Sequence, residues 1–155
     1  MLFRSPKGTR SSKVEDIVTG PGKTSLKKDE FVVSITLPER PKKSGDAYLR
    51  FIPRTEMDIA VVGAGVSLTL DKKGVCTHAR VALGAVAPKP LLVKDGAKAL
   101  IGTTVDAAAL DALAAAASAA CNPIDDKRGT IEYRTKVAGV LARRAAVIAL
   151  ERARA

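Results

Sequence analysis

The character of the sequence changes at Pro88 and Pro90, and this change constrains the fold more than any other feature. Before it, segments rich in Val, Ile, Leu and Thr alternate with turn residues, which is typical of β-strands. After it, alanine-rich segments with periodic apolar residues predict helices. Strands followed by helices indicate an α+β fold. We therefore expect an antiparallel β-sheet of three to four strands, followed by three helices packed on one face.

Four segments are predicted as strands, at residues 31–37, 47–52, 58–70 and 75–86. A hairpin turn at residues 71–74 joins the last two. Gly63 and Gly65 indicate a bulge or a tight contact within the third strand. In the fourth, the alternation of side chains places on one face Thr77, Ala79, Val81 and Leu83.

Three helices are predicted after the prolines. The first spans residues 92–100 and ends at the capping residue Gly102. Thr104 is the expected N-cap of the second, at residues 105–121. The last begins at Thr130, and its periodicity directs inward Val137, Val140, Leu141 and Ile148.

The beginning of the chain has no such pattern. Residues 1–13 are polar and basic, so they predict a disordered leader. The string GPGKTS at residues 20–25 is similar to a phosphate-binding loop, but Ile17 stands where that motif requires glycine. The string AVVGAGVSL is similar to a dinucleotide-binding motif, but Leu68 occupies the third glycine position. Both strings are interpreted as turn and strand segments.

Bulk properties limit the function classes. The net charge of +10 is compatible with nucleic acid or an acidic partner, but it is not gathered in one run. Aromatic residues make up only 3% of the chain and do not form the stacking platforms of RNA readers, so nucleic-acid binding is not expected. No apolar run approaches the roughly 20 residues that a membrane span requires. Two cysteines without metal-ligand spacing suggest free thiols, and we expect a cytoplasmic protein.

The residues by themselves reveal no catalytic constellation. His78 is the only histidine, and no other residues complete a catalytic set around it. Asp125 and Asp126 precede a predicted helix, where the helix dipole stabilises negative charge. Residue chemistry alone therefore leaves a basic α+β domain, and the alternative function is a non-enzymatic binding module for nucleic acid or an acidic protein.

Three stretches carry a family resemblance: Asp16 to Pro38, Tyr48 to Gly74, and Pro123 to Arg144. In this order they resemble the FAD-binding (medium) subunit of the xanthine dehydrogenase and aerobic carbon monoxide dehydrogenase family, the molybdenum hydroxylases. The resemblance assigns residues 14–40 to a remnant of the FAD-binding domain and residues 41–155 to the CO dehydrogenase flavoprotein C-terminal domain. It implies the same α+β layout.

The resemblance also implies an oxidoreductase subunit. In that family, electrons from a molybdenum cofactor in a large subunit pass through 2Fe–2S clusters in a small subunit to FAD in the medium subunit, and then to an external acceptor. The glycine-rich loops that hold the FAD diphosphate belong to an N-terminal half that this sequence does not contain. We therefore expect no activity and no tight FAD binding from the chain alone. Three explanations of the short sequence remain open: a truncated gene, a partial reading frame and one half of a split subunit.

Four residues are the candidate flavin-site residues by resemblance. Arg50 matches a position whose cation contacts the flavin ring and would stabilise the negative charge of the reduced ring. Val32 matches an aliphatic position close to the ring. Arg54 and Asp58 match a loop that flanks the flavin, and the alternative is an ion pair that only fixes the turn.

A second matching group lies at the start of the last helix, and we interpret it as structural, with subunit docking as an alternative. It comprises Asp126, Arg128, Gly129, Tyr133 and Arg134. Tyr133 is expected to be buried with a partner for its hydroxyl.

Overall fold

The computed structural model describes residues 1–55 and 57–155. The described chain divides into two compact units, Met1–Arg40 and Pro41–Ala155. Each unit has its own β-sheets, and no sheet is shared between them. The two units are therefore described separately.

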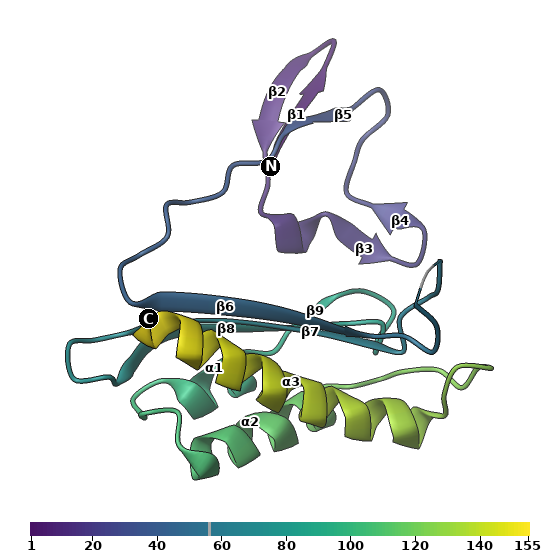
Figure 1. Cartoon of the computed structure of the whole chain (residues 1–155). Coiled ribbons are helices and arrows are strands. Elements are labelled where there is room, and N and C mark those ends of the chain that lie inside the picture. Colours follow the sequence, from purple (N-terminus) through teal and green to yellow (C-terminus); the bar gives the residue numbers. More distant parts are fainter. Residues whose placement is uncertain (56) are drawn as a thin grey trace. The chain divides into compact units, whose positions relative to one another are not determined.

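The first unit is built from short strands and one helical turn. These are β1 (Leu2–Ser5), β2 (Gly8–Ser11), η1 (Val14–Asp16), β3 (Val18–Gly20), β4 (Lys23–Thr24) and β5 (Phe31–Ser34). Strands β2, β1 and β5 form an antiparallel sheet in that order, and β3 pairs with β4 (Figure 1). All four residues of β5 are exposed, at one edge of the three-stranded sheet.

The prediction of a disordered leader over residues 1–13 is wrong, because β1 and β2 form a hairpin there. Phe3 is fully buried, and the guanidinium of Arg10 lies 4.4 Å from the centroid of its ring. Arg10 also donates hydrogen bonds to both carboxylate oxygens of Glu30, at 2.8 and 2.7 Å. A cation–π contact and a bidentate ion pair thus stabilise a segment whose local composition is poor in apolar residues.

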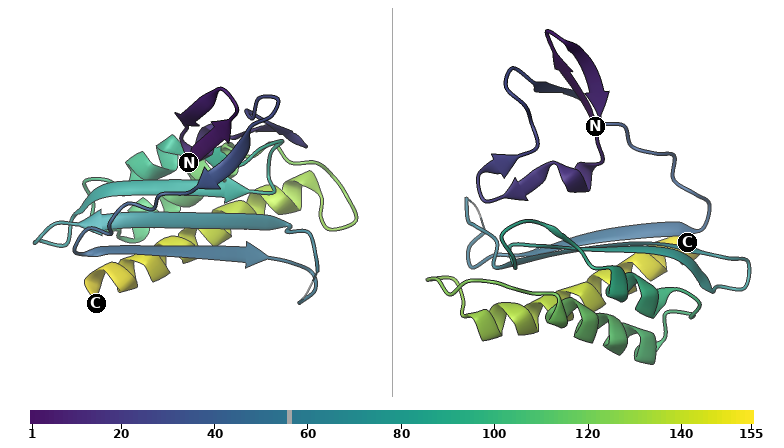
Figure 2. Two further views of the ribbon diagram at one scale, coloured as in Figure 1. Left: turned by 90° about the horizontal axis from the view of Figure 1, so that it is seen from above. Right: turned by 180° about the vertical axis from the view of Figure 1, so that it is seen from behind.

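The second unit is a four-stranded sheet covered by three helices. Its elements are β6 (Ser44–Phe51), β7 (Val62–Leu70), β8 (Cys76–Gly84), β9 (Leu91–Leu92), α1 (Lys94–Leu100), α2 (Ala107–Ala119) and α3 (Ile131–Arg154). The strands are antiparallel in the order β6-β7-β8-β9. All three helices lie on one face (Figures 1 and 2). The predicted α+β fold is confirmed.

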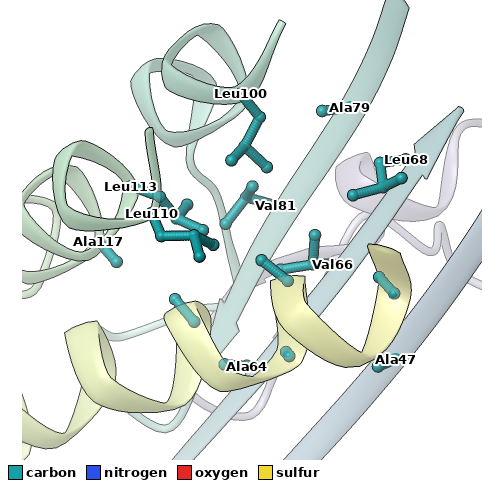
Figure 3. Packing of buried hydrophobic residues seen from close by; sticks show 14 of the residues in the cluster. Ala47, Ala64, Val66, Leu68, Ala79, Val81, Leu100, Leu110, Leu113 and Ala117 are labelled. Carbon is teal, nitrogen blue, oxygen red and sulfur yellow. The ribbon is translucent and has the colours of Figure 1, made fainter. Parts of the chain in front are cut away.

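The core lies between the sheet and the helices. Figure 3 shows Val66, Leu68 and Val81 from the strands facing Leu100 and Leu113 from the helices, and all are buried. Each such side chain contributes roughly 1.5–3 kcal/mol when it is removed from water. With few aromatic residues, the core is aliphatic.

Small residues let α3 lie directly on the sheet. A β-carbon at Gly45 of β6 would lie 2.0 Å from the carbonyl oxygen of Ala149, so only glycine fits there. The buried face of the helix is mostly alanine: Ala138, Ala142, Ala145, Ala146, Ala149 and Ala153. Val140, predicted to point inward, is 41% exposed, because this alanine face lies on the sheet instead.

The strand assignments differ from the predictions at several places, and the third strand, predicted at 58–70, begins only at Val62. The predicted strand at 31–37 is the shorter β5 and pairs with β1, while the fourth strand of the helix-covered sheet is β9. Thr77 is exposed rather than on the inward face with Ala79, because the β7–β8 register shifts beside Leu70, which pairs with Cys76. The bulge adds one residue and reverses the alternation.

The predicted N-cap of the second helix is also wrong. Asp106, rather than Thr104, caps α2, and its carboxylate accepts a 3.0 Å hydrogen bond from the backbone N–H of Ala109. Val105 has a φ of 58°, which places it outside the helix. The prediction for Thr130 holds, because its hydroxyl accepts from the N–H of Tyr133.

Among residues 1–55 and 57–155, no helix has both the length and the apolar character needed to cross a bilayer. No group of three or more His, Cys, Asp and Glu side chains in this part of the chain could hold a metal ion.

Candidate functional site

The candidate site lies on the face of the second unit's sheet that is opposite the helices. Alternation along β6 puts Tyr48 and Arg50 on this face, and both are exposed. On β7, Gly65 stands opposite Tyr48, and Gly63 stands opposite Arg50. The sheet therefore presents an aromatic ring and a cation over a strip of backbone without side chains.

The ring of Tyr48 lies on this glycine strip. A β-carbon at Gly63 would lie 2.6 Å from the Tyr48 hydroxyl oxygen, and one at Gly65 would lie 3.6 Å from its Cδ2. The ring thus extends from Gly65 toward Gly63, the residue that faces Arg50. Tyr48 remains 66% exposed, so most of the ring is available to a ligand or partner. The predicted tight contact at Gly63 and Gly65 is this contact with Tyr48.

A hollow of about 380 Å³ adjoins the ring. Its lining includes Tyr48, Gly65 and the cationic side chains of Arg80 and Arg152. Arg152 donates a 2.6 Å hydrogen bond to the carbonyl oxygen of Asp46, which ties the end of α3 to β6. Asp46 also lines this hollow, so charges of both signs surround Tyr48.

Arg50 is directed toward the loop that follows its strand. Its guanidinium Nη2 donates a hydrogen bond to the backbone carbonyl of Asp58. The loop is closed by a 2.9 Å hydrogen bond from the N–H of Val61 to the carbonyl of Phe51. The position of the Arg50 charge therefore depends on how this loop is held.

The carboxylate of Asp58 is buried within that loop, with its side chain only 3% exposed. Its Oδ1 accepts hydrogen bonds from the N–H of Ile59 at 2.8 Å and from Arg128 Nε at 3.1 Å. Its Oδ2 accepts from Arg54 Nε at 3.3 Å. Burial alone raises the pKa of Asp58, but the hydrogen bonds from Arg128, Arg54 and Ile59 together outweigh it and hold the pKa below its ordinary value.

Arg134 is the second charged residue buried in this unit, at 3% exposure. Its Nη2 lies 2.6 Å from Asp126 Oδ1, and its Nη1 donates to the carbonyl oxygens of Val61 at 2.8 Å and Ala85 at 3.3 Å. Arg134 thus joins the start of α3 to the ends of two loops. The hydrogen bonds from Arg128 N–H and the Arg134 guanidinium lower the pKa of Asp126.

The structure brings together three of the four predicted site residues. Arg50, Arg54 and Asp58 meet at one loop, and the ion pair offered as the alternative for Arg54 and Asp58 is present. Val32 belongs to β5 of the first unit and is 41% exposed. Tyr133, predicted to be buried, is 45% exposed, and its ring packs edge-on against Phe51 with centroids 6.3 Å apart.

Sequence reasoning did not identify Tyr48 as a site residue. The sequence did contain a signal for Tyr48: it stands two positions before Arg50, so in a strand both side chains lie on the same face. Arg128 was recognised only as structural, and its contact with Asp58 spans 70 residues of sequence.

Comparisons with known proteins show the family of the chain. The family model described as "CO dehydrogenase flavoprotein C-terminal domain" matches residues 47–149. The chain therefore belongs to the CO dehydrogenase flavoprotein C-terminal domain family.

Particular relatives are FAD-binding and medium subunits of dehydrogenases. The chain is 39% identical over 150 residues to the carbon monoxide dehydrogenase medium chain of Afipia carboxidovorans, covering 97% of this chain and 50% of that one. It is 29% identical over 133 residues to a xanthine dehydrogenase FAD-binding subunit of Escherichia coli O157:H7, covering 85% and 45%.

A solved structure gives the same result. A chain of the reconstituted CO dehydrogenase from Oligotropha carboxidovorans superposes with a TM-score of 0.92 at 36% identity, covering 97% of this chain and 52% of that chain. The chain thus spans about half the length of the curated relatives it matches.

Proposed function

We propose that this chain is the C-terminal part of the FAD-carrying subunit of a molybdenum hydroxylase, and that the face with Tyr48 and Arg50 forms one wall of its flavin site. The relatives named as FAD-binding subunits support the first statement. The observation that carries the second is an exposed tyrosine ring on a glycine strip, with a cation two residues away.

The chemistry of this face fits an isoalloxazine ring. A flat aromatic ligand can stack on or pack beside the exposed ring of Tyr48, an interaction worth about 0.5–1.5 kcal/mol beyond burial. When bound, FAD supplies the capacity to accept and pass on electrons. The fixed charge of Arg50 favours negative charge on a neighbouring ring.

The remaining predicted residues have supporting roles in this proposal. Arg54 and Asp58 hold the loop that receives the Arg50 guanidinium. Val32 belongs to the first unit, and its closeness to the flavin ring stays a prediction from the family resemblance. The FAD diphosphate requires backbone N–H groups of the kind that glycine-rich loops supply, and we assign these to the other half of the subunit.

The assembly follows from the same proposal. The partners are the N-terminal FAD-binding half, a small subunit with 2Fe–2S clusters and a large subunit with the molybdenum cofactor. FAD, when bound, would supply the capacity to accept electrons from the clusters and to pass them to an external acceptor, and we propose a cytoplasmic location. The chain alone carries out no reaction.

The experiment combines this chain with the N-terminal half of a related FAD subunit and measures FAD affinity and the flavin midpoint potential. Arg50→Ala should weaken FAD binding by about 1–2 kcal/mol, as for a hydrogen bond to a charged group, or shift the potential. Arg143→Ala is the matched control, because Arg143 pairs only with the exposed Asp111 on α2 among its described ion pairs. Wild-type affinity and potential in Arg50→Ala would exclude the flavin role of this residue.

A further inference from the structure

Arg50 has a defined direction because its acceptor is a backbone carbonyl. A carbonyl cannot move independently of its loop, whereas a side-chain acceptor can change rotamer. The orientation of the Arg50 guanidinium is therefore set by the placement of Asp58. What holds Asp58 in place also determines where the Arg50 charge lies.

Two cations hold the Asp58 carboxylate, and they differ in exposure. The side chain of Arg54 is 71% exposed, so water and salt weaken its 3.3 Å contact. The side chain of Arg128 is 30% exposed and reaches Oδ1 at 3.1 Å. Arg128 is thus the better-shielded partner, and it comes from a different part of the chain.

Arg128 is itself fixed by Asp126. The carboxylate Oδ1 of Asp126 accepts a 2.8 Å hydrogen bond from the backbone N–H of Arg128, and its Oδ2 lies 3.8 Å from Arg128 Nη1. The turn is closed by backbone hydrogen bonds between Asp126 and Gly129. The Arg128 side chain therefore projects from a closed turn rather than from a free loop.

Arg134 connects this turn to the other end of the Asp58 loop. It is buried, bonds Asp126 at 2.6 Å, and donates to the carbonyl of Val61. Val61 is also the residue that closes the loop onto Phe51. One series of charged contacts thus restrains both the middle and the end of the loop that receives Arg50.

We propose that Arg128 and Arg134, linked by Asp126, are positioning residues that fix the direction of the Arg50 guanidinium through Asp58. The proposal rests on the proposed function for its role in the flavin site, but the positioning can be measured without flavin. The turn before α3 and the first turn of α3 would then set the place of a charge on β6.

The first test uses the full chain alone, labelled at its arginines for NMR. Rotation about the Cζ–Nε bond of Arg50 should be hindered in the wild type, with its signals assigned by their loss in Arg50→Lys. Arg128→Gln should accelerate this rotation, because the loop loses its shielded cation. Arg143→Gln, which removes the same charge from the outer side of α3, should leave it unchanged.

Unchanged Arg50 signals in Arg128→Gln would overturn the proposal, and so would equal acceleration in Arg128→Gln and Arg143→Gln. Arg128→Lys should give an intermediate rate of Arg50 rotation. Lysine keeps the positive charge but lacks the planar guanidinium, which contacts the carboxylates of both Asp58 and Asp126. If Arg134→Gln does not fold, the Arg128 series alone decides the outcome.

The second test measures FAD affinity after the N-terminal half of a related subunit is added. Arg128→Gln should lose affinity several-fold, and combined with Arg50→Ala it should add nothing beyond the loss from Arg50→Ala alone. Independent, additive losses would overturn the positioning role. If Arg128→Gln frees Arg50 in the NMR experiment but Arg50→Ala keeps full FAD affinity, the positioning stands and the proposed flavin role fails.

Discussion

Replacing Gly63 with alanine separates the role of the Tyr48 ring from the stability of the sheet. The new β-carbon would lie 2.6 Å from the Tyr48 hydroxyl oxygen and 3.3 Å from Cε2 and Cζ. Ordinary carbon contacts need about 3.5 Å, so the ring must move by about 1 Å. The ring is 66% exposed and can swing outward without disturbing the core.

The effect on folding should be small, whereas the effect on the flavin should be clear. Alanine in a strand gains about 0.5–1 kcal/mol over glycine, which offsets much of the cost of moving the ring. The free energy of unfolding should stay within about 1 kcal/mol of the wild type. FAD affinity in the assembled subunit should fall about three- to tenfold, since an aromatic pair is worth about 0.5–1.5 kcal/mol.

Gly84→Ala provides a matched control for this experiment. Gly84 stands opposite Gly63 on β8, and nothing lies within 4 Å of where its β-carbon would be. Tyr48→Phe should partly rescue Gly63→Ala, because it removes the closest contact. FAD titration followed by flavin fluorescence provides the assay. Equal FAD affinity in Gly63→Ala and Gly84→Ala would refute the role assigned to the Tyr48 ring.

Three further predictions test the surrounding framework. Arg134→Met should lower the free energy of unfolding by about 3 kcal/mol, since three backbone carbonyls and the Asp126 carboxylate lose a charged donor. Circular dichroism should show a drop of about 12 °C in Tm. Arg143→Met should change the Tm little, and equal melting of the two variants would contradict the structural role of the buried Arg134. The hydrogen bond from Arg10 is the main cause that lowers the pKa of Glu30 to about 2. The stability that Glu30 contributes to folding is therefore present above its unfolded pKa and is lost as the pH falls toward 2. NMR signals of β1 and β2 should broaden or shift in acid, and Arg10→Gln should cause the same change at neutral pH. The chain should pass through a nucleic-acid column at moderate salt, because its positive charge is not gathered in one run and aromatic residues make up only 3% of the sequence. Retention with a steep salt dependence would favour the binding-module alternative.

The order of elements could be predicted because each local pattern agrees with the global fold. Alternating β-branched strands and alanine-rich helices occupy separate parts of the sequence, so the α+β class followed directly. The hairpin of β1 and β2 could not be predicted, because Arg10 stabilises it through Phe3 and through Glu30, twenty positions away. The bulge beside Thr77 likewise depends on pairing with β7.

The candidate site was only partly visible in the sequence. The resemblance supplied Arg50, Arg54 and Asp58, which lie together in the structure. The contact of the Tyr48 ring with Gly63 and Gly65 depends on the register between β6 and β7, which a single sequence does not reveal. Arg128 contacts Asp58 over a separation of 70 residues in the sequence, and no local pattern encodes such a contact.

FAD titration of the N-terminal half of a related subunit, with and without this chain, tests the central claim most directly. The chain alone should be colourless and should not bind FAD tightly. Added to the other half, it should raise FAD affinity and quench flavin fluorescence, and Tyr48→Ala combined with Arg50→Ala should abolish most of that gain. A yellow stoichiometric complex of the chain alone, or unchanged affinity and fluorescence when the wild-type chain is added, would contradict the claim that this domain forms a wall of the flavin site.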